Sequence, residues 1–309
     1  MLALTGGTIY VSPADDPVRD GVVLVDGDTI AAIGRSVPPD AETLDCGGAT
    51  ISAGFWNSHV HFFERKWADA ASIPASELAR QLRDTFTRYG FTSVFDLSSS
   101  LANTRVIRER IERGEVAGPR IRTTGEGLVP PGAMPPDAVL QIMGVVNTPL
   151  PEIADAAQAA ATARRLLDQG VDGIKLFAST PRGTPLPAGA MDAAVDEAHR
   201  AGKPVFVHPT TGDDVLAALR AGIAAGGAVL FGTDLGAVDP DPSDEYALMA
   251  AAGMRFRDIL ASLTTAPAAR FGGSARLTAG APADVVVFEG EDFANVRYTL
   301  RAGAVLFRR

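Results

Sequence analysis

Residues 54–62 read Gly-Phe-Trp-Asn-Ser-His-Val-His-Phe, an apolar run that ends in two histidines separated by one residue. In a β-strand the side chains alternate between faces, so His59 and His61 would share one face and Val60 would point to the other. Two neutral imidazoles on one face suit a divalent metal such as zinc. The plainer alternative is a pair of polar residues at the end of a sheet strand, and the surrounding sequence has to decide between the two.

Residues 53–273 alternate apolar strands with alanine-rich amphipathic helices, a pattern that predicts βαβ units and a parallel sheet. Each predicted strand ends in or just before a polar residue, and in parallel barrels the carboxyl ends of the strands build the active site. The six predicted strands are 54–62, 92–97, 120–124, 173–178, 204–208 and 228–234. The predicted helices are 76–89, with Ser76 as N-cap and Gly90 as the stop, then 104–113, 153–169, 190–201, 213–221, 243–252 and 255–263.

Both ends of the chain have a different pattern of short strands and turns. Residues 22–25 and 29–34 flank Asp26-Gly27-Asp28, and Asp-Gly between two apolar runs is a strong hairpin signal. Residues 284–288 and 296–307 show the same pattern of short strands and turns near the other terminus. We therefore expect an α/β protein in which residues 1–52 and 274–309 form a small β-sandwich beside a TIM-like barrel of residues 53–273.

Composition restricts the function classes. The chain has 309 residues, 46% of them hydrophobic and 21% charged, and a net charge of −9. This charge argues against nucleic acid or an anionic membrane as partner, since both need basic patches. The single cysteine, Cys46, excludes an intrachain disulfide and is expected to be a packed residue of a reducing compartment. Without a signal-type segment or an apolar run of roughly 20 residues, a cytoplasmic protein with a small-molecule substrate is expected, as a monomer or homo-oligomer.

Three more polar residues end predicted strands: Lys175, His208 and Asp234. Alone, each has an ordinary explanation: a surface cation, a buried imidazole and a helix cap. The order His-x-His, Lys, His, Asp on successive strands would rarely arise by chance. His199 differs, because it lies within a predicted helix on the outside of the barrel. Asn57, Glu64 and Asp96 lie near strand ends, where substrate contact and simple strand-end hydrogen bonding are equally open.

This set of residues resembles the metal site of the amidohydrolase superfamily, in its binuclear, carboxylated-lysine, imidazolonepropionase- and dipeptidase-like branch. The resemblance implies that His59 and His61 are first-strand metal ligands and that Lys175 is N6-carboxylated and bridges two metals. It also implies that His208 is the fifth-strand ligand and Asp234 the last-strand ligand. One or two Zn²⁺ ions, or other divalent metals, are the implied cofactor. The tail 280–287 looks like the family's return into its sandwich.

The resemblance implies a metal-dependent hydrolase that cleaves C–N bonds, other than the main protein backbone, in a small molecule. N-acyl amino acids, dipeptides and cyclic amides are all open as substrates. Asp234 would be the catalytic residue, taking a proton from water and delivering it to the leaving nitrogen. Two alternatives remain: a lactone or ester hydrolase of the same superfamily, and a non-catalytic, metal-poor homologue that acts as a binding protein. The long loop 127–151 is expected as a lid, an oligomer contact or simple packing over the barrel mouth.

One segment departs from the family pattern, which has eight strands and a sixth-strand histidine. Residues 209–233, between His208 and Asp234, number 25 and contain no histidine. A βαβ unit takes about 30 residues, so strands six and seven have no room. Either a segment near 221–225 is missing, or the shortened barrel is closed by another subunit. We expect the metal held by His59, His61, Asp234 and the Lys175 bridge to be bound better than the second metal, which is left with Lys175 and His208.

Overall fold

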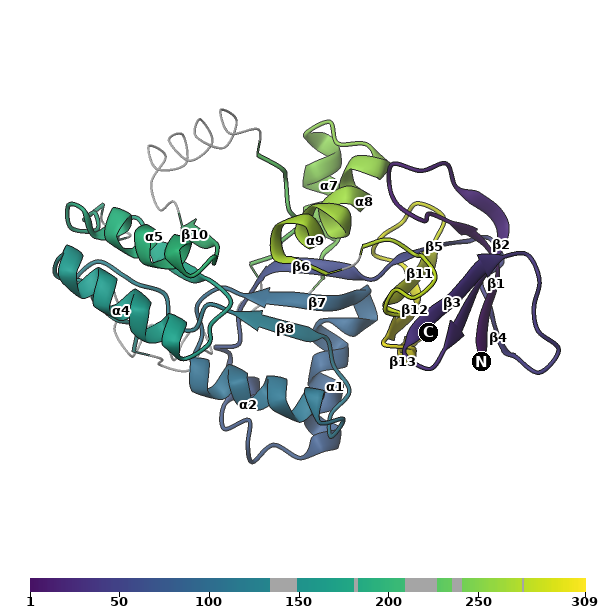
Figure 1. Cartoon of the computed structure of the whole chain (residues 1–309), viewed down its shortest axis with the longest axis horizontal. Coiled ribbons are helices and arrows are strands. Elements are labelled where there is room, and N and C mark those ends of the chain that lie inside the picture. The colour runs from purple at the N-terminus through teal and green to yellow at the C-terminus, as the bar shows by residue number, and fades with distance from the viewer. Residues whose placement is uncertain (134–148, 181–182, 209–226, 235–240, 274) are drawn as a thin grey trace.

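The computed structural model describes residues 1–133, 149–180, 183–208, 227–234, 241–273 and 275–309. A sheet built from both chain termini lies at one end of the molecule, and an α/β region that begins at β6 fills the rest (Figure 1). The predicted helix 213–221 and most of the loop 127–151 lie outside the described residues. Among the helices of the described residues, none has the length and apolar character to cross a membrane.

The terminal sheet has eight strands, with the order β13-β12-β11-β5-β1-β2-β3 and β4 paired with β1. The N- and C-terminal strands meet where β5 pairs with β11 in antiparallel register, from Ala53 opposite Val285 to Ala49 opposite Glu289. The strands are β1 (Leu2–Ile9), β2 (Val18–Asp26), β3 (Thr29–Gly34), β4 (Glu42–Asp45), β5 (Ala49–Ala53), β11 (Val285–Glu289), β12 (Val296–Arg301) and β13 (Ala304–Arg308).

The hairpin predicted at Asp26-Gly27-Asp28 is confirmed, since β2 and β3 pair up to Asp26 opposite Thr29. Gly27 has a positive φ of 57°, which explains why a glycine is needed in this tight turn. The termini thus share one hydrogen-bonded sheet, whose buried side includes Val23, Ile51 and Val285. Its arrangement as a face-to-face sandwich and the domain boundaries at 52/53 and 273/274 stay predictions.

The α/β region contains two parallel sheets. The first has the order β6 (Phe55–Val60), β7 (Phe91–Asp96), β8 (Arg120–Thr123), and the second pairs β9 (Ile174–Phe177) with β10 (Val205–His208). Between them, a parallel bridge joins Leu128 to Leu176, and the Asp172 amide donates to the Thr123 carbonyl at 2.7 Å. Parallel pairing is therefore observed for five of the six predicted strands, while closure into a barrel stays a prediction.

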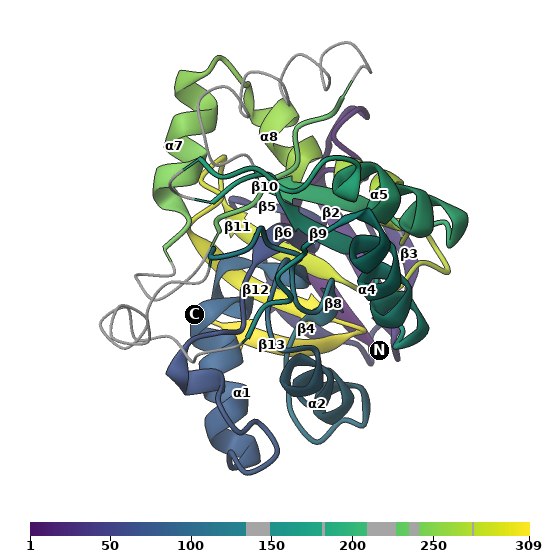
Figure 2. The same ribbon diagram turned by 90° about the vertical axis from the view of Figure 1, so that its left-hand side faces the viewer.

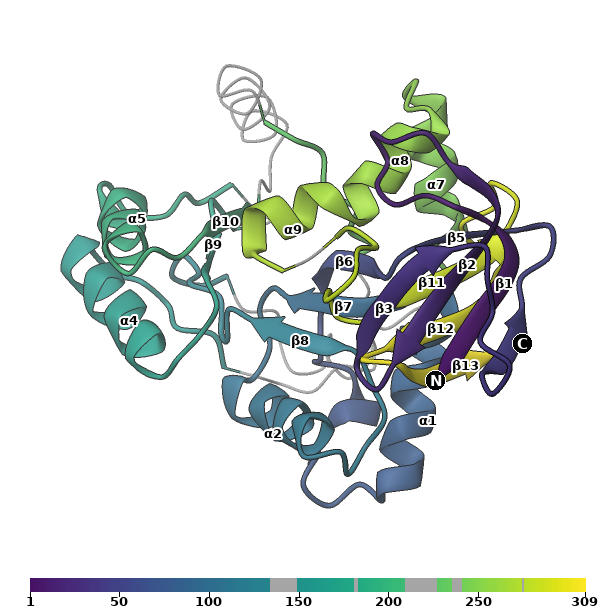
Figure 3. The same ribbon diagram turned by 45° about the vertical axis from the view of Figure 1, so that its right-hand side comes forward.

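Helices cover these sheets on different sides, with α1 and α2 opposite α7, α8 and α9, and α4 and α5 beside β9 and β10 (Figures 1 and 3). Figure 2 looks onto the molecule from the side of α4 and α5. The helices are α1 (Ala75–Thr85), α2 (Leu101–Glu112), α4 (Ala156–Asp168), α5 (Ala190–Arg200), α7 (Ser243–Ala251), α8 (Phe256–Leu263) and α9 (Thr265–Phe271), with short 3₁₀ turns η1 (Arg65–Trp67) and η2 (Thr87–Tyr89).

Two helix details differ from the prediction. Ser76 is not the N-cap of α1, because the helix begins one residue earlier with Pro74 at that position and no side-chain cap. The stop at Gly90 is confirmed: its φ of 84° is left-handed and ends the short turn η2 after α1. The helix α9 was not predicted, because a seven-residue helix that contains Pro267 carries almost no periodic signal.

The predicted last strand, 228–234, is not a regular strand. It nevertheless runs beside β6, where the Ser58 amide donates to the Phe231 carbonyl at 2.8 Å and the Asp234 amide donates to the His59 carbonyl at 2.9 Å. On its other side the Phe231 amide donates to the Ser262 carbonyl, at the end of α8. The two backbone hydrogen bonds to β6 place Asp234 at the end of that strand.

The two parallel sheets face each other across aromatic rings. The Phe95 ring of β7 lies 4.8 Å from the Phe206 ring of β10 and 4.9 Å from the Phe271 ring of α9, measured between centroids. Trp56 of β6 packs against Phe271 in the same cluster. The opposite faces of β6 and β7 bury a larger core against the helices. Side chains of both parallel sheets therefore share one apolar cluster with α9.

Candidate metal centre

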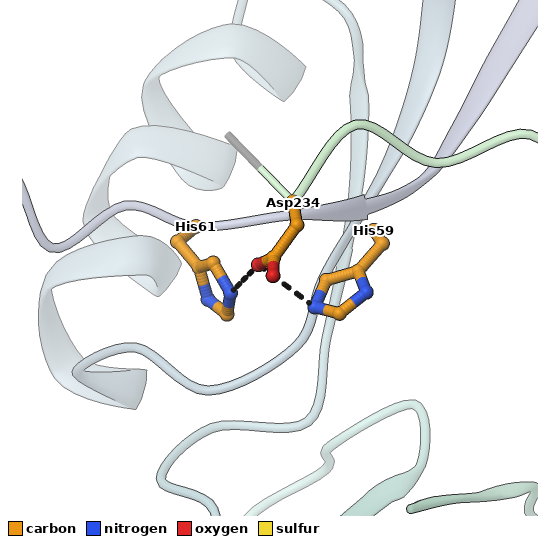
Figure 4. Close-up of side chains that lie close together, drawn as sticks. All are labelled: His59, His61 and Asp234. Atoms are coloured by element: carbon orange, nitrogen blue, oxygen red, sulfur yellow. Dashed lines mark hydrogen bonds and ion pairs between the residues drawn. The ribbon is translucent and has the colours of Figure 1, made fainter. Parts of the chain in front are cut away.

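Three of the five predicted site residues converge at the end of β6. The Asp234 carboxylate lies between the two imidazole rings (Figure 4), with Oδ1 at 2.8 Å from His61 Nε2 and 3.2 Å from His59 Nε2. One ligand atom from each of the three lies within 4.8 Å of the others. Strand alternation places both histidines on one face, as the His-x-His spacing requires.

The convergence is possible because the backbone at Gly232 lies very close to that of β6. A Cβ added at Gly232 would lie only 2.8 Å from the Cβ of His59, so a larger residue would push the segment away from β6. Two residues later, Asp234 has a φ of 50°, a left-handed conformation that aspartate adopts more readily than most residues. Its amide donates to the His59 carbonyl and anchors that turn.

Both ring nitrogens of His61 face hydrogen-bond acceptors. Nδ1 lies 3.3 Å from the Ser98 carbonyl, and Nε2 lies 2.8 Å from Asp234 Oδ1. A neutral imidazole carries one N–H, so a neutral His61 donates to only one of these two oxygens. A cation bound by Nε2 and Asp234 would leave the N–H of Nδ1 for the Ser98 carbonyl. A carbonyl that holds the second nitrogen of a histidine is also the usual support of metal-binding imidazoles.

The charges of this group suit a metal ion. Burial lowers the pKa of His59 to about 3, and the positive charge of Lys175 adds to this effect. The hydrogen bond from His61 holds the pKa of Asp234 well below its usual range. At neutral pH the group therefore offers a free imidazole nitrogen and an ionised carboxylate, the protonation states that metal binding requires.

The geometry accommodates zinc with small movements. Tetrahedral zinc with bonds of about 2.1 Å separates its ligand atoms by about 3.4 Å. The observed separations from Asp234 Oδ1, 2.8 and 3.2 Å, are a few tenths of an ångström shorter. The Asp234 side chain is 57% exposed, so this side of the group is open for an approaching molecule.

Lys175 lies on the neighbouring sheet and is almost completely buried. It is the second of the four residues of β9, so the prediction that it ends a strand is wrong. Its Nζ lies 5.4 Å from the centroid of the Phe177 ring, and Phe206 lies opposite on β10. Burial lowers the pKa of Lys175 to about 8, an effect that the negative charge of Asp234 opposes. A buried ammonium group in an apolar setting is unusual for a lysine with a purely structural role and is typical of a functional lysine.

His208 ends β10, directly opposite Phe177, with 5.2 Å between the two ring centroids. Paired residues of parallel strands share a face, so His208, Phe177 and Lys175 all face the interior. Burial and the charge of Lys175 lower the pKa of His208. Within the described ranges, however, the group that meets the distance requirement for one metal consists of His59, His61 and Asp234. His208 therefore lies outside this group, while the charge of Lys175 acts on both His59 and Asp234.

The other residues raised from the sequence have structural partners. His199 is exposed on α5, as expected. Asp96 is buried and accepts hydrogen bonds from three hydroxyl groups, and Glu64 pairs with Lys66 at 2.8 Å. The contact of Ser98 with His61 was missed, because a backbone carbonyl leaves no sequence signal. Asn57 was raised from the sequence as a strand-end residue, and its amide is bonded to Thr233.

No protein-family model matches the chain, and no curated protein sequence matches it. Solved structures do match its fold over nearly the whole chain. A Xaa-Pro dipeptidase with bound methionine is 19% identical, with a TM-score of 0.80 over 98% of this chain and 99% of that one. A prolidase complexed with N-methylphosphonate-L-proline is 21% identical, with a TM-score of 0.75 and 100% of both chains covered. Ochratoxinase from A. niger is 18% identical, with a TM-score of 0.74 over 99% and 95%. At these identities the likeness shows a shared fold.

Proposed function

We propose that this chain is a metal-dependent hydrolase that cleaves a C–N amide bond in a small molecule. One observation carries the proposal: two imidazole nitrogens and a carboxylate oxygen converge within 4.8 Å at the carboxyl end of a parallel strand. In α/β barrels this end of the strands is where active sites are built. The fold shared with a dipeptidase and a prolidase supports the same reaction class.

In this proposal His59, His61 and Asp234 hold a first metal ion, while Lys175 and His208 serve a second. A bound divalent metal supplies Lewis acidity, which lowers the pKa of water and polarises a carbonyl. The protein supplies position and proton transfer. Asp234 is ionised and 57% exposed, so its carboxylate is able to accept a proton from water and to pass it to the leaving nitrogen.

Lys175 would take part as a carbamate. Its neutral amine reacts with CO₂ to give a lysine carbamate and one proton, which replaces a cation beside the metal ligands by an anion. Only the unprotonated amine reacts, and a pKa of about 8 leaves an appreciable fraction unprotonated near neutral pH. Burial therefore prepares Lys175 for this modification. A carbamate there would add an anionic oxygen ligand on the face of the sheet that also carries His208.

Dipeptides and N-acyl amino acids are the substrates that we favour. Among the similar structures, one is a Xaa-Pro dipeptidase and another is a prolidase that holds a phosphonate derivative of proline. A second candidate function, a metal-poor binding protein, is favoured by one observation. In the described part of the chain, the protein ligands that converge suffice for one metal and His208 stays outside the group.

A hydrolysis screen tests the proposal. Purified protein, loaded with Zn²⁺, Co²⁺ or Mn²⁺ in the presence of bicarbonate, is incubated with Xaa-Pro dipeptides, N-acyl amino acids, cyclic amides and lactones. We expect release of a free amine from at least one amide, lost in Asp234→Asn and kept in the matched control His199→Asn on the exposed face of α5. Turnover of lactones alone favours the ester-hydrolase alternative. Bound metal without any turnover favours the binding protein.

A further inference from the structure

Asn57 is a fully buried polar residue of β6, two residues before His59. The register of β6 against β7 shifts between Asn57 and Val60, so regular alternation does not hold through this stretch. The Asn57 side chain points to the neighbouring segment of residues 227–234 and not to the three converging ligand atoms. Its burial demands hydrogen bonds at both ends of the amide.

The Asn57 amide is bonded at both ends. Nδ2 donates to Thr233 Oγ1 at 2.7 Å, and Oδ1 accepts from the Thr233 amide at 3.2 Å. Oδ1 also accepts from the amide of His59 at 3.3 Å. One side chain thus binds the residue before Asp234 and, at the same time, the backbone of His59. His59 and Asp234, the residue that follows Thr233, are the two residues that share a carboxylate-to-imidazole contact.

The segment needs such a bond because regular sheet pairing does not hold it. Residues 227–234 form no strand, and toward β6 their backbone makes the bonds at Phe231 and Asp234 already described. Thr233 lies between these two, where its amide points at Asn57 in place of a backbone carbonyl. The left-handed φ of Asp234 comes directly after this contact.

We propose that Asn57 is a positioning residue for the metal centre, which sets the distance between Asp234 and His59 by gripping Thr233 on one side and the His59 backbone on the other. The inference rests on the proposed metal-binding function and adds a residue that does not contact metal or substrate. Only an amide performs this task. An aspartate lacks the donor for Thr233 Oγ1, and a leucine of the same shape lacks donor and acceptor.

Metal affinity tests the proposal without relying on activity. Zinc affinity is measured by competition with a chelating dye, and the visible spectrum of the Co²⁺ form reports the ligand geometry. For Asn57→Ala we expect a 10- to 100-fold weaker affinity, the usual effect of losing support behind metal ligands. For Thr233→Val we expect about a fivefold loss, near the worth of one hydrogen bond. Thr233→Ser, which keeps the hydroxyl, restores the affinity and the Co²⁺ spectrum.

Thr92→Val is the matched control. Thr92 is a buried threonine on β7 whose hydroxyl donates to the Phe55 carbonyl of β6 at 3.5 Å, away from the metal residues. It should leave zinc affinity and the Co²⁺ spectrum unchanged. If Asn57→Ala does not fold, the comparison of Thr233→Val with Thr233→Ser tests the proposal by itself.

The outcomes separate the two levels of inference. If the unaltered protein binds no zinc, the proposed function fails, and the role of Asn57 fails with it. If the unaltered protein binds zinc and Asn57→Ala and Thr233→Val bind it equally well, only the positioning role is overturned. Equal losses in Thr233→Val and Thr92→Val would also overturn it, because a loss of general packing then accounts for the effect.

Discussion

His61 Nε2 lies 2.8 Å from Asp234 Oδ1, although the two residues are 173 positions apart in the sequence. In a neutral imidazole only one of the two nitrogens carries a proton, and the other nitrogen of His61 faces the Ser98 carbonyl. A neutral His61 therefore donates to only one of these two oxygens, and a cation bound by Nε2 and Asp234 would leave the N–H of Nδ1 for Ser98. With His59, the pair brings three ligand atoms within 4.8 Å of one another, which is the structural argument for a metal centre.

Lys175→Met should remove one contribution to the pH dependence of stability of the metal-free protein between about pH 8 and 10.5. In the folded protein the pKa of Lys175 is about 8, against an ordinary value of 10.5. Between these values the unfolded chain binds a proton at Lys175 that the folded chain has released, so this residue makes the free energy of unfolding rise with pH. This contribution should be absent in Lys175→Met, because a methionine of similar length has no charge to bury.

Urea unfolding of both metal-free proteins between pH 7 and 10.5 measures this difference. At pH 7 the variant should be at least as stable as the unaltered protein, since an ammonium group no longer has to be desolvated. A variant that is clearly less stable at pH 7 would show that the Lys175 ammonium contributes stabilising contacts. The same variant should lose hydrolysis, because it cannot form a carbamate.

Glu197→Gln should weaken the packing of α4 against α5. It should also remove a contribution to the free energy of unfolding that is lost in acid. Glu197 of α5 pairs with Arg164 of α4 at 3.0 Å and with Arg200 on its own helix, contacts that lower its pKa to about 2. Between pH 4.5 and 2 the unfolded chain binds the extra proton, so this stability is lost as the pH falls through that window.

Thermal unfolding of Glu197→Gln across pH 2 to 7 should show a smaller dependence on pH below 4.5 than the unaltered protein. Arg164 and Arg200 are both largely exposed, so the effect at neutral pH should be small. Glu109→Gln, from a surface pair with Arg113, is the matched control and should change the profile little. An unchanged acid profile in Glu197→Gln would contradict the prediction.

Asp96→Asn should destabilise the fold and loosen His61. The buried Asp96 carboxylate accepts from Thr104 at 3.1 Å, from Thr123 at 2.8 Å and from Ser99 at 2.6 Å. Ser99 in turn accepts from the amide of residue 62, directly after His61. An asparagine presents an N–H₂ group to hydroxyl donors, which should cost about 1–3 kcal/mol in the free energy of unfolding.

The adjacent backbone explains why zinc affinity should fall as well. Ser98 has a φ of 100°, a strained conformation for serine, and its carbonyl faces His61 Nδ1. The Asp96–Ser99 contact holds this turn, so its loss should weaken zinc binding by tenfold or more. Denaturant unfolding and chelator competition measure the two effects. A loss of stability with unchanged zinc affinity would show that the turn does not position His61.

Much of this architecture was predictable from local pattern. The Asp-Gly turn at Gly27 and the apolar strands before Asp96 and His208 are signals of sequence alone, because turn geometry and strand burial depend on nearby residues. The convergence of His59, His61 and Asp234 followed from strand order and resemblance. The wrong N-cap at Ser76 shows the limit of this reasoning at helix ends, where one residue of register changes the cap.

What escaped prediction depends on backbone atoms and distant segments. The carbonyl of Ser98 contacts His61, which lies 37 residues away in the sequence, and Asn57 is hydrogen-bonded to Thr233, which lies 176 residues away. Nothing in the local sequence encodes these contacts, because they arise only when β6, β7 and the segment 227–234 are brought side by side. For the same reason the segment 228–234 was predicted as a strand, although its backbone pairs with β6 without regular ladder geometry.

Zinc titration of the metal-free protein with a competing chelating dye tests the central claim most directly. The account predicts one tightly bound zinc per chain, with a second ion held more weakly. Tight binding should be lost in His61→Asn and retained in His199→Asn, whose histidine is exposed on α5. Absence of tight zinc in the unaltered protein, or equal binding by His61→Asn, would contradict a metal centre at His59, His61 and Asp234.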